Sequence, residues 1–134
     1  MSGASSTKAR STFVHSAVAA AGSLACVLLV INNLRDIDSD RASNKKTMAV
    51  RFGEGFARFE VAFFAIAPFV LTMFVAQLRH RDWMLLPLAA FLMALGLINK
   101  TKKATGRELN RCLALAGAMQ WIFGILFVMG TRIS

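Results

Sequence analysis

Four apolar stretches, separated by short polar ones, set the pattern of this chain. They cover about residues 13–33, 57–78, 83–98 and 112–130. A membrane-spanning helix needs roughly 20 mainly apolar residues, with a lower limit of about 17. The first, second and fourth stretches exceed that limit, and the third, 83–98, lies close to it. The pattern therefore predicts an all-α integral membrane bundle of about four transmembrane helices.

Polar and proline positions divide this bundle further. Residues 1–12 are polar and small, and we expect a loosely ordered N-terminal segment there. The first apolar stretch runs directly into a polar segment, so we interpret it as a retained span and not as a cleaved leader. Residues 13–134 then form the membrane domain, with a polar loop at 34–56. Pro68, near the middle of the second stretch, predicts a kink.

The densest polar segment runs from Asn32 to Gly53 and reads NNLRDIDSDRASNKKTMAVRFG. Its carboxylates and cations are Asp36, Asp38, Asp40, Arg35, Arg41, Lys45, Lys46 and Arg51. If the helix of the first stretch continues through Asp36, then Asp36 and Asp40 share one face and Asp38 points to the opposite side. Two like charges at that spacing repel each other, which favours a bound cation between them.

The chemistry of this segment fits a magnesium–diphosphate site. Mg²⁺ takes one or two protein carboxylates and completes its shell with water and substrate phosphates. The cations that follow the acidic pair can bind the remaining phosphate charge. A solvated loop of mixed charges has the same composition, however, and short acidic motifs occur often by chance. The spacing alone leaves both interpretations open.

Composition independently indicates a membrane protein. Hydrophobic residues make up 56% of the 134 positions, and the mean hydropathy is +0.54, which is too apolar for a soluble domain of this size. The net charge of +9 does not indicate nucleic-acid binding, because the basic residues form short clusters between apolar runs without interleaved aromatics. Cys26 and Cys112 stand alone in apolar stretches, fit no zinc spacing, and are interpreted as buried thiols.

The distribution of cations predicts an orientation. Eleven Lys and Arg side chains lie in residues 35–58 and 100–111, whereas five lie at the opposite face of a four-span arrangement. Cytoplasmic loops carry an excess of Lys and Arg. We therefore expect a multi-pass protein of the inner (plasma) membrane, with the motif loop in the cytoplasm and both termini outside.

The sequence of the polar segment resembles the second aspartate-rich motif of the UbiA superfamily of intramembrane prenyltransferases. The most similar branch is the 1,4-dihydroxy-2-naphthoate polyprenyltransferases (the MenA branch), which typically read NN(I/L)RDIxxDxxxGKxTxxVxxG. Every fixed position is met except the glycine before the lysine, which is Asn44 here. Asparagine tolerates left-handed backbone, so we expect the turn to survive. The GRELN stretch at 106–110 also resembles that branch, and the resemblance covers roughly residues 25–130.

The resemblance implies a reaction and a role for each motif residue. A polyprenyl chain would pass from its diphosphate to an aromatic quinone precursor in menaquinone biosynthesis, with Mg²⁺ bound by Asp36 and Asp40 drawing charge from the diphosphate. The candidate diphosphate-binding residues are Arg41, Lys45, Lys46 and Arg51. The candidate supporting residues are Asn32, Asn33, Arg35 and Asp38. The family also implies an apolar tunnel, although we interpret the eleven phenylalanines as packing and lipid contacts.

One departure from the family concerns the rest of the site. Family enzymes have about nine spans and an earlier NDxxD-type motif, and nothing in this sequence matches that motif. We therefore expect the chain to correspond to the C-terminal half of such an enzyme, whether as a fragment, a split subunit or an inactive copy. A complementary N-terminal half or a homodimer are the partners this implies.

The alternatives from other classes are a small multi-span transporter and a non-catalytic membrane subunit. The transporter lacks support because no acidic residue lies at mid-depth in a predicted span.

Overall fold

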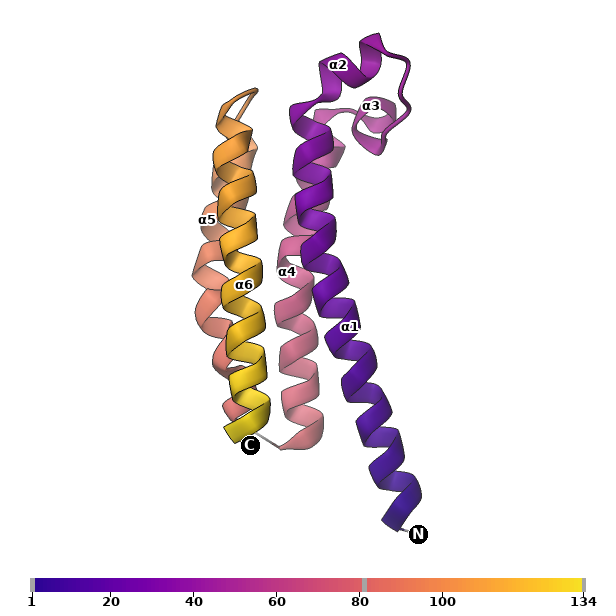
Figure 1. The fold of residues 1–134 in the computed structure, drawn as a ribbon, viewed down its shortest axis with the longest axis vertical. Helices are drawn as coiled ribbons and strands as arrows, with labels where there is room; N and C mark the ends of the chain where they lie inside the picture. Colours follow the sequence, from indigo (N-terminus) through magenta and orange to yellow (C-terminus); the bar gives the residue numbers. More distant parts are fainter. Residues whose placement is uncertain (1, 81, 134) are drawn as a thin grey trace.

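The computed structural model describes residues 2–80 and 82–133, and within them the chain is almost entirely helical (Figure 1). The long helices are α1 (Ser2–Arg35), α4 (Glu54–Arg79), α5 (Phe91–Lys103) and α6 (Glu108–Ile133). A 3₁₀ helix, η1 (Asp82–Ala90), leads into α5. Two short helices, α2 (Ile37–Ala42) and α3 (Met48–Phe52), connect α1 to α4. The predicted all-α class is confirmed.

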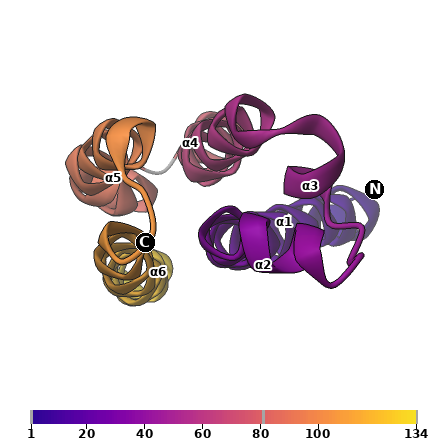
Figure 2. The same cartoon turned by 90° about the horizontal axis from the view of Figure 1, so that it is seen from above.

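The four long helices form a bundle with two different ends. Helices α2 and α3 lie at one end together with the connection between α5 and α6, and both termini lie at the other end (Figure 1). Seen along the bundle, α1, α4, α5 and α6 occupy four corners, with α4 beside α5 and α6 beside α1 (Figure 2). The two most cationic segments of the sequence therefore lie at the same end of the bundle.

A core of apolar side chains joins the helices along their length. Phe69 of α4 is 2% exposed and packs edge-on against Phe91 of α5 and Phe123 of α6, with ring centroids 5.3 and 5.5 Å apart. Val27 and Ile31 of α1 are fully buried in the same cluster. Edge-to-face aromatic pairs of this kind contribute about 0.5–1.5 kcal/mol beyond the area that they bury.

The outer surface carries many large apolar side chains, which fits a lipid environment. Four helical segments are long and apolar enough to cross a membrane: Gly3–Arg35, Glu54–Leu78, Leu85–Lys103 and Glu108–Ile133. Large side chains on their outer faces, such as Leu92 at 77% and Trp121 at 76%, remain exposed. A soluble monomer rarely exposes so much contiguous apolar surface. The chain is thus a multi-pass membrane protein.

The helices extend further than the apolar stretches suggested. Helix α1 begins at Ser2, so the segment expected to be loosely ordered forms its first turns instead. Residues 34–56, expected as a loop, contain α2 and α3. Helix α4 continues through Pro68, where the Thr72 hydroxyl donates to the Pro68 carbonyl at 2.7 Å. Apolar periodicity marks the part of a helix that lies in lipid, and polar turns beyond it carry no such signal.

Candidate functional site

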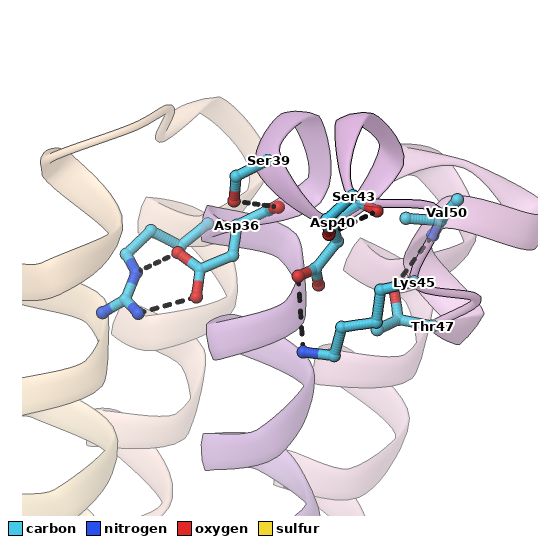
Figure 3. Close-up of polar contacts among 8 residues, drawn as sticks. Asp36, Ser39, Asp40, Ser43, Lys45, Thr47 and Val50 are labelled. Carbon is cyan, nitrogen blue, oxygen red and sulfur yellow. Dashed lines mark hydrogen bonds and ion pairs between the residues drawn. The ribbon is translucent and has the colours of Figure 1, made fainter.

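The acidic segment begins where α1 ends. Helix α1 stops at Arg35, and Asp36 is a turn residue with φ −96° and ψ 11°. The expectation of one continuous helix through Asp36 and Asp40 is therefore wrong in detail. The break is slight, because Asp36 N–H donates to the Asn32 carbonyl at 3.1 Å and Asp40 N–H donates to the Asp36 carbonyl at 2.8 Å. The helical hydrogen-bond pattern continues through the break. The carboxylates of Asp36 and Asp40, however, form ion pairs with different cations (Figure 3).

Asp36 is held by the residue before it. Arg35 Nε donates to Asp36 Oδ1 at 2.7 Å, and Arg35 Nη2 donates to Oδ2 at 2.8 Å, which makes a two-pronged ion pair. These hydrogen bonds, and secondarily the positive charges of Arg35 and Lys45, hold the pKa of the Asp36 carboxyl below its usual value. Asp36 is therefore ionised throughout the physiological pH range. An ionised carboxylate is the form that binds a metal ion.

Asp40 is the one buried carboxylate among the described residues, with 7% of its surface exposed. Lys45 Nζ lies 3.3 Å from its Oδ1 atom. The other oxygen, Oδ2, is buried and has no hydrogen-bond partner in the described part of the chain. A buried carboxylate oxygen without a partner costs free energy, so this atom is a candidate ligand for a cation.

Serine hydroxyls shape the backbone around both carboxylates. Ser39 Oγ donates to the Asp36 carbonyl at 2.9 Å, and Ser43 Oγ donates to the Asp40 carbonyl at 3.2 Å (Figure 3). In each case a hydroxyl three residues later supports the peptide that carries the acid. Such local side-chain bonds favour helix ends and turns over long helices, which explains why α2 is short.

Asn44 ends α2 and turns the chain back toward Asp40. Its φ of 58° is left-handed. Lys45 N–H donates to the Asp40 carbonyl at 2.8 Å and Asn44 N–H to the Arg41 carbonyl at 3.2 Å. This pair of bonds is a Schellman motif, in which glycine or asparagine takes the left-handed position. The expectation for Asn44 is confirmed, and the motif is what brings Lys45 to the Asp40 carboxylate.

The end of the polar segment is built from a helix cap and a glycine. Thr47 caps α3, its Oγ1 accepting from Val50 N–H at 3.3 Å (Figure 3). Gly53 follows α3 with φ 89°, a backbone conformation that side chains rarely adopt. The threonine and the glycine of the motif pattern are thus explained by local structure. They direct the chain from the acidic site into α4.

The remaining predicted site residues lie around this pair. Asp38 is exposed and pairs with Arg41 at 3.4 Å, away from the other two acids. Lys46 and Arg51 are exposed, as is Asn32, whereas Asn33 is half-buried. The structure therefore joins Arg35 to Asp36 and Lys45 to Asp40, and it leaves Lys46 and Arg51 exposed at the surface.

The residues present fit a shared metal ion only in part. Within residues 2–80 and 82–133, no group of three or more His, Cys, Asp or Glu side chains is arranged to hold a metal. Asp40 nevertheless offers a buried free oxygen, and Asp36 offers an ionised carboxylate one helical turn earlier. Mg²⁺ needs few protein ligands when water and phosphate oxygens supply the rest. The donor set is suited to a magnesium–phosphate complex.

Sequence reasoning missed two contacts. Asn110 accepts a hydrogen bond from Arg35 Nη1 at 3.1 Å and so belongs to the site. The GRELN stretch drew attention to this position without indicating its partner. Arg58 of α4 donates to the carbonyls of Thr101 and Ala104, the latter at 3.2 Å, and pairs with Glu54. The sequence alone indicated Arg58 only as a further cation near a predicted span.

These features define a class: a multi-pass helical membrane protein with an acidic and basic site at one end of its bundle. The profile of the UbiA prenyltransferase family matches residues 3–129, nearly the whole chain. The chain belongs to the UbiA prenyltransferase family, and the resemblance seen in the polar segment is confirmed.

Two relatives share one name. The chain is 36% identical over 123 residues to 1,4-dihydroxy-2-naphthoate octaprenyltransferase of Escherichia coli (strain K12), covering 86% of this chain and 38% of that protein. It is 35% identical over 107 residues to the protein of that name from Mycobacterium tuberculosis (strain ATCC 25618 / H37Rv), covering 79% and 36%. The chain thus spans little more than a third of the length of these relatives. No solved structure matches it.

Proposed function

We propose that this chain carries one part of a magnesium-dependent prenyltransferase site, which transfers a polyprenyl chain from its diphosphate to 1,4-dihydroxy-2-naphthoate in menaquinone biosynthesis. Membership of the UbiA family and the names of both relatives support this reaction. The position of the site, at the end of a membrane bundle, suits a substrate with a charged head and an apolar tail.

The observation that carries the proposal is the free, buried Oδ2 atom of Asp40. A folded protein stabilises such an oxygen by pairing it, and no described residue does so. Asp40 and Asp36 are the residues that would hold Mg²⁺. The ion would supply charge withdrawal from the diphosphate, which makes the allylic C–O bond easier to break.

Cations of the α2–α3 segment are the candidates to bind the diphosphate. Lys45 lies beside Asp40, and Arg41, Lys46 and Arg51 are exposed on the same short stretch. Lysine and arginine bind phosphate oxygens through charge-assisted hydrogen bonds. Stabilisation of the departing pyrophosphate by fixed cations lowers the barrier to bond breaking. The chain's own contribution is therefore to orient the diphosphate and to neutralise its charge.

An apolar groove supports a place for the prenyl chain. It lies between α1 and α6, has a volume of about 760 Å³, and is lined mainly by alanine, glycine and large apolar side chains. On α1 it runs from Ala17 to Leu28, which is the stretch that precedes the acidic segment. A diphosphate held at Asp36 and Asp40 would direct its apolar tail toward this groove.

The proposal includes a partner and an orientation. Two carboxylates are few for a diphosphate complex, so we propose that a complementary N-terminal half, or a second copy of this chain, supplies further ligands. Turnover that appears only when such a half is co-expressed would identify the partner. The excess of cations at the motif end supports a cytoplasmic position for that end in an inner-membrane protein.

The test is a titration with farnesyl thiodiphosphate, a diphosphate analogue that resists ionisation, with and without Mg²⁺. The wild-type chain in lipid nanodiscs is compared with Asp36→Asn, Asp40→Asn and the matched control Asp38→Asn. Loss of Asp36 or Asp40 should weaken magnesium-dependent binding by ten- to hundred-fold, or roughly 1–3 kcal/mol. Asp38→Asn should do much less, because Asp38 is exposed and pairs with Arg41.

Two results would contradict the proposal. Equal effects at Asp36, Asp38 and Asp40 would indicate a diffuse electrostatic surface with no defined metal site. Magnesium-independent binding in the wild type would show that the acidic pair serves another purpose.

A further inference from the structure

We propose that Arg35 is a positioning residue, which fixes the Asp36 carboxylate relative to the start of α6 through Asn110. Its role in metal binding rests on the function proposed above, whereas the link itself does not. Three nitrogens of one guanidinium are engaged: Nε and Nη2 with the two oxygens of Asp36, at 2.7 and 2.8 Å, and Nη1 with Asn110 Oδ1 at 3.1 Å.

The geometry of this contact explains why arginine stands here. A guanidinium is a rigid planar fork whose donors keep fixed directions. Two prongs on Asp36 remove the rotation of its carboxylate, and the third ties the same plane to Asn110. A lysine would carry the same charge but could not hold both oxygens and a third acceptor together. The position of Asp36 is therefore set by α6 as well as by α1.

Asn110 lies in the first turn of α6, and its own surroundings are fixed. Thr105 N–H donates to Glu108 Oε2 at 3.2 Å, and Asn110 N–H donates to the Arg107 carbonyl at 3.1 Å. These bonds hold the connection between α5 and α6 in shape. Asn110 is thus a defined anchor for Arg35, 75 residues away in sequence.

The link spans the same two helices that flank the apolar groove. The groove is lined by Ala17–Leu28 of α1 and by Gly117–Met129 of α6. The Arg35–Asn110 hydrogen bond joins these helices beyond the groove, at the end that carries Asp36 and Asp40. A shift of α6 relative to α1 therefore changes the orientation of the Asp36 carboxylate.

The first experiment tests the link without reference to activity. Nitroxide labels are placed at Ala42→Cys and Arg107→Cys, two exposed positions, in a chain whose natural Cys26 and Cys112 are replaced. The distance distribution is measured by electron spin resonance in nanodiscs. Arg35→Met and Asn110→Ala should each broaden it, and the double variant should broaden it no further. The controls Arg111→Met and Asn99→Ala, both exposed, should leave it unchanged.

The second experiment measures the Mg²⁺ concentration that gives half-maximal binding of farnesyl thiodiphosphate. Asn110→Ala should raise it by roughly three- to thirtyfold, which lies within the roughly two- to 150-fold range that coupling between contacting residues produces. In an Arg35→Met background, Asn110→Ala should add nothing, because its partner is gone. Arg35→Lys should not restore the wild-type value.

The outcomes separate the two proposals. Broadened distances without magnesium-dependent binding in the wild type would support the link and contradict the proposed function. Unchanged distances in both Arg35→Met and Asn110→Ala would overturn the positioning role, whatever the binding shows. Additive effects of the two substitutions on the magnesium requirement would also overturn it.

Discussion

Lys45 Nζ lies 3.3 Å from Asp40 Oδ1, and the two residues are joined by a left-handed turn at Asn44. The Schellman motif that ends α2 reverses the chain within five residues, so a cation that follows the helix returns to an acid inside it. The pair leaves Asp40 Oδ2 free. Backbone geometry at Asn44 therefore decides whether the acidic site has its cation.

The first prediction concerns this turn. Asn44→Val should destabilise the protein by about 1–2 kcal/mol, because a β-branched residue is strained in left-handed backbone. Asn44→Gly should keep or slightly raise the melting temperature, since glycine adopts φ of 58° without strain. Thermal unfolding in detergent measures both. The control Ala42→Val lies in the last turn of α2 and should cost less, and a larger loss there than at Asn44 would contradict the argument.

The second prediction concerns Lys45 and its neighbour. Lys45→Ala should weaken binding of farnesyl thiodiphosphate several-fold and leave its magnesium dependence in place, because lysine contacts the anion and not the metal. Lys102→Ala is the matched control and should leave binding unchanged, since Lys102 is an exposed lysine in the last turn of α5, outside the α2–α3 segment. Loss of magnesium dependence in Lys45→Ala would mean that Lys45 organises the metal site itself.

Much of this site could be predicted from the sequence. The polar segment, its acids and its cations followed from residue type and spacing, and the turn at Asn44 followed from the resemblance to the family motif. The partner of each acid did not. Whether Asp36 meets Arg35 or a distant cation depends on the turn at Asp36, and a dihedral change of one residue carries no sequence signal. The Arg35–Asn110 contact joins residues 75 positions apart, which only the packing of α1 against α6 determines.

The fold likewise divides into features that the sequence predicted and features that it did not. Four apolar stretches predicted four spans because lipid selects apolar side chains over about 20 residues. The ends of the helices were missed at Ser2 and within 34–56, where polar residues continue a helix into water. There the stabilising contacts are caps and ion pairs, such as Thr47 on Val50. These leave a weaker pattern than a buried face.

The third prediction concerns the hydrogen bonds between α4 and the end of α5. Arg58 is largely buried and donates to the carbonyls of Thr101 and Ala104 at the end of α5, where carbonyl groups lack helical partners. Arg58→Ala should lower stability by about 1–3 kcal/mol, because these buried acceptors lose their donor. Thermal unfolding in detergent is the measurement.

A matched control separates this contact from loss of charge. Arg107→Ala also removes one cation at the same end of the bundle, but Arg107 is exposed, so stability should hardly change. Arg58→Lys keeps the charge and should still lose stability, since a single ammonium group cannot replace two nitrogens, of which Nη1 donates to the two carbonyls and Nη2 to Glu54. Full rescue by lysine would show that charge alone matters.

The fourth prediction concerns acid pH. Arg35 lowers the pKa of Asp36 below its ordinary value of 3.8, so the folded state binds this proton less readily than the unfolded state. The stability that follows is complete above the ordinary pKa and is lost as pH falls through the lowered one. The difference in melting temperature between wild type and Asp36→Asn should stay constant from neutral pH to about pH 5 and shrink only in stronger acid. A difference that already shrinks near neutrality would contradict the lowered pKa.

The last prediction concerns the side of the membrane on which the site lies. Helices α2 and α3 and the connection between α5 and α6 lie at one end of the bundle, and both termini lie at the other (Figure 1). The exposed cations Lys46, Lys102 and Arg107 are at the first end. Because an excess of Lys and Arg stays in the cytoplasm, we expect that end to face inward.

Single cysteines at exposed positions test this orientation in a chain without its natural cysteines. Lys46→Cys and Arg107→Cys should resist a membrane-impermeant maleimide in intact cells and react after the membrane is opened. Arg132→Cys, exposed near the C-terminus, should react in both conditions. Labelling of Arg107→Cys in intact cells would place the site outside and contradict the orientation inferred from the distribution of Lys and Arg. Opposite results at Lys46→Cys and Arg107→Cys would contradict the bundle itself, since both positions belong to the same end.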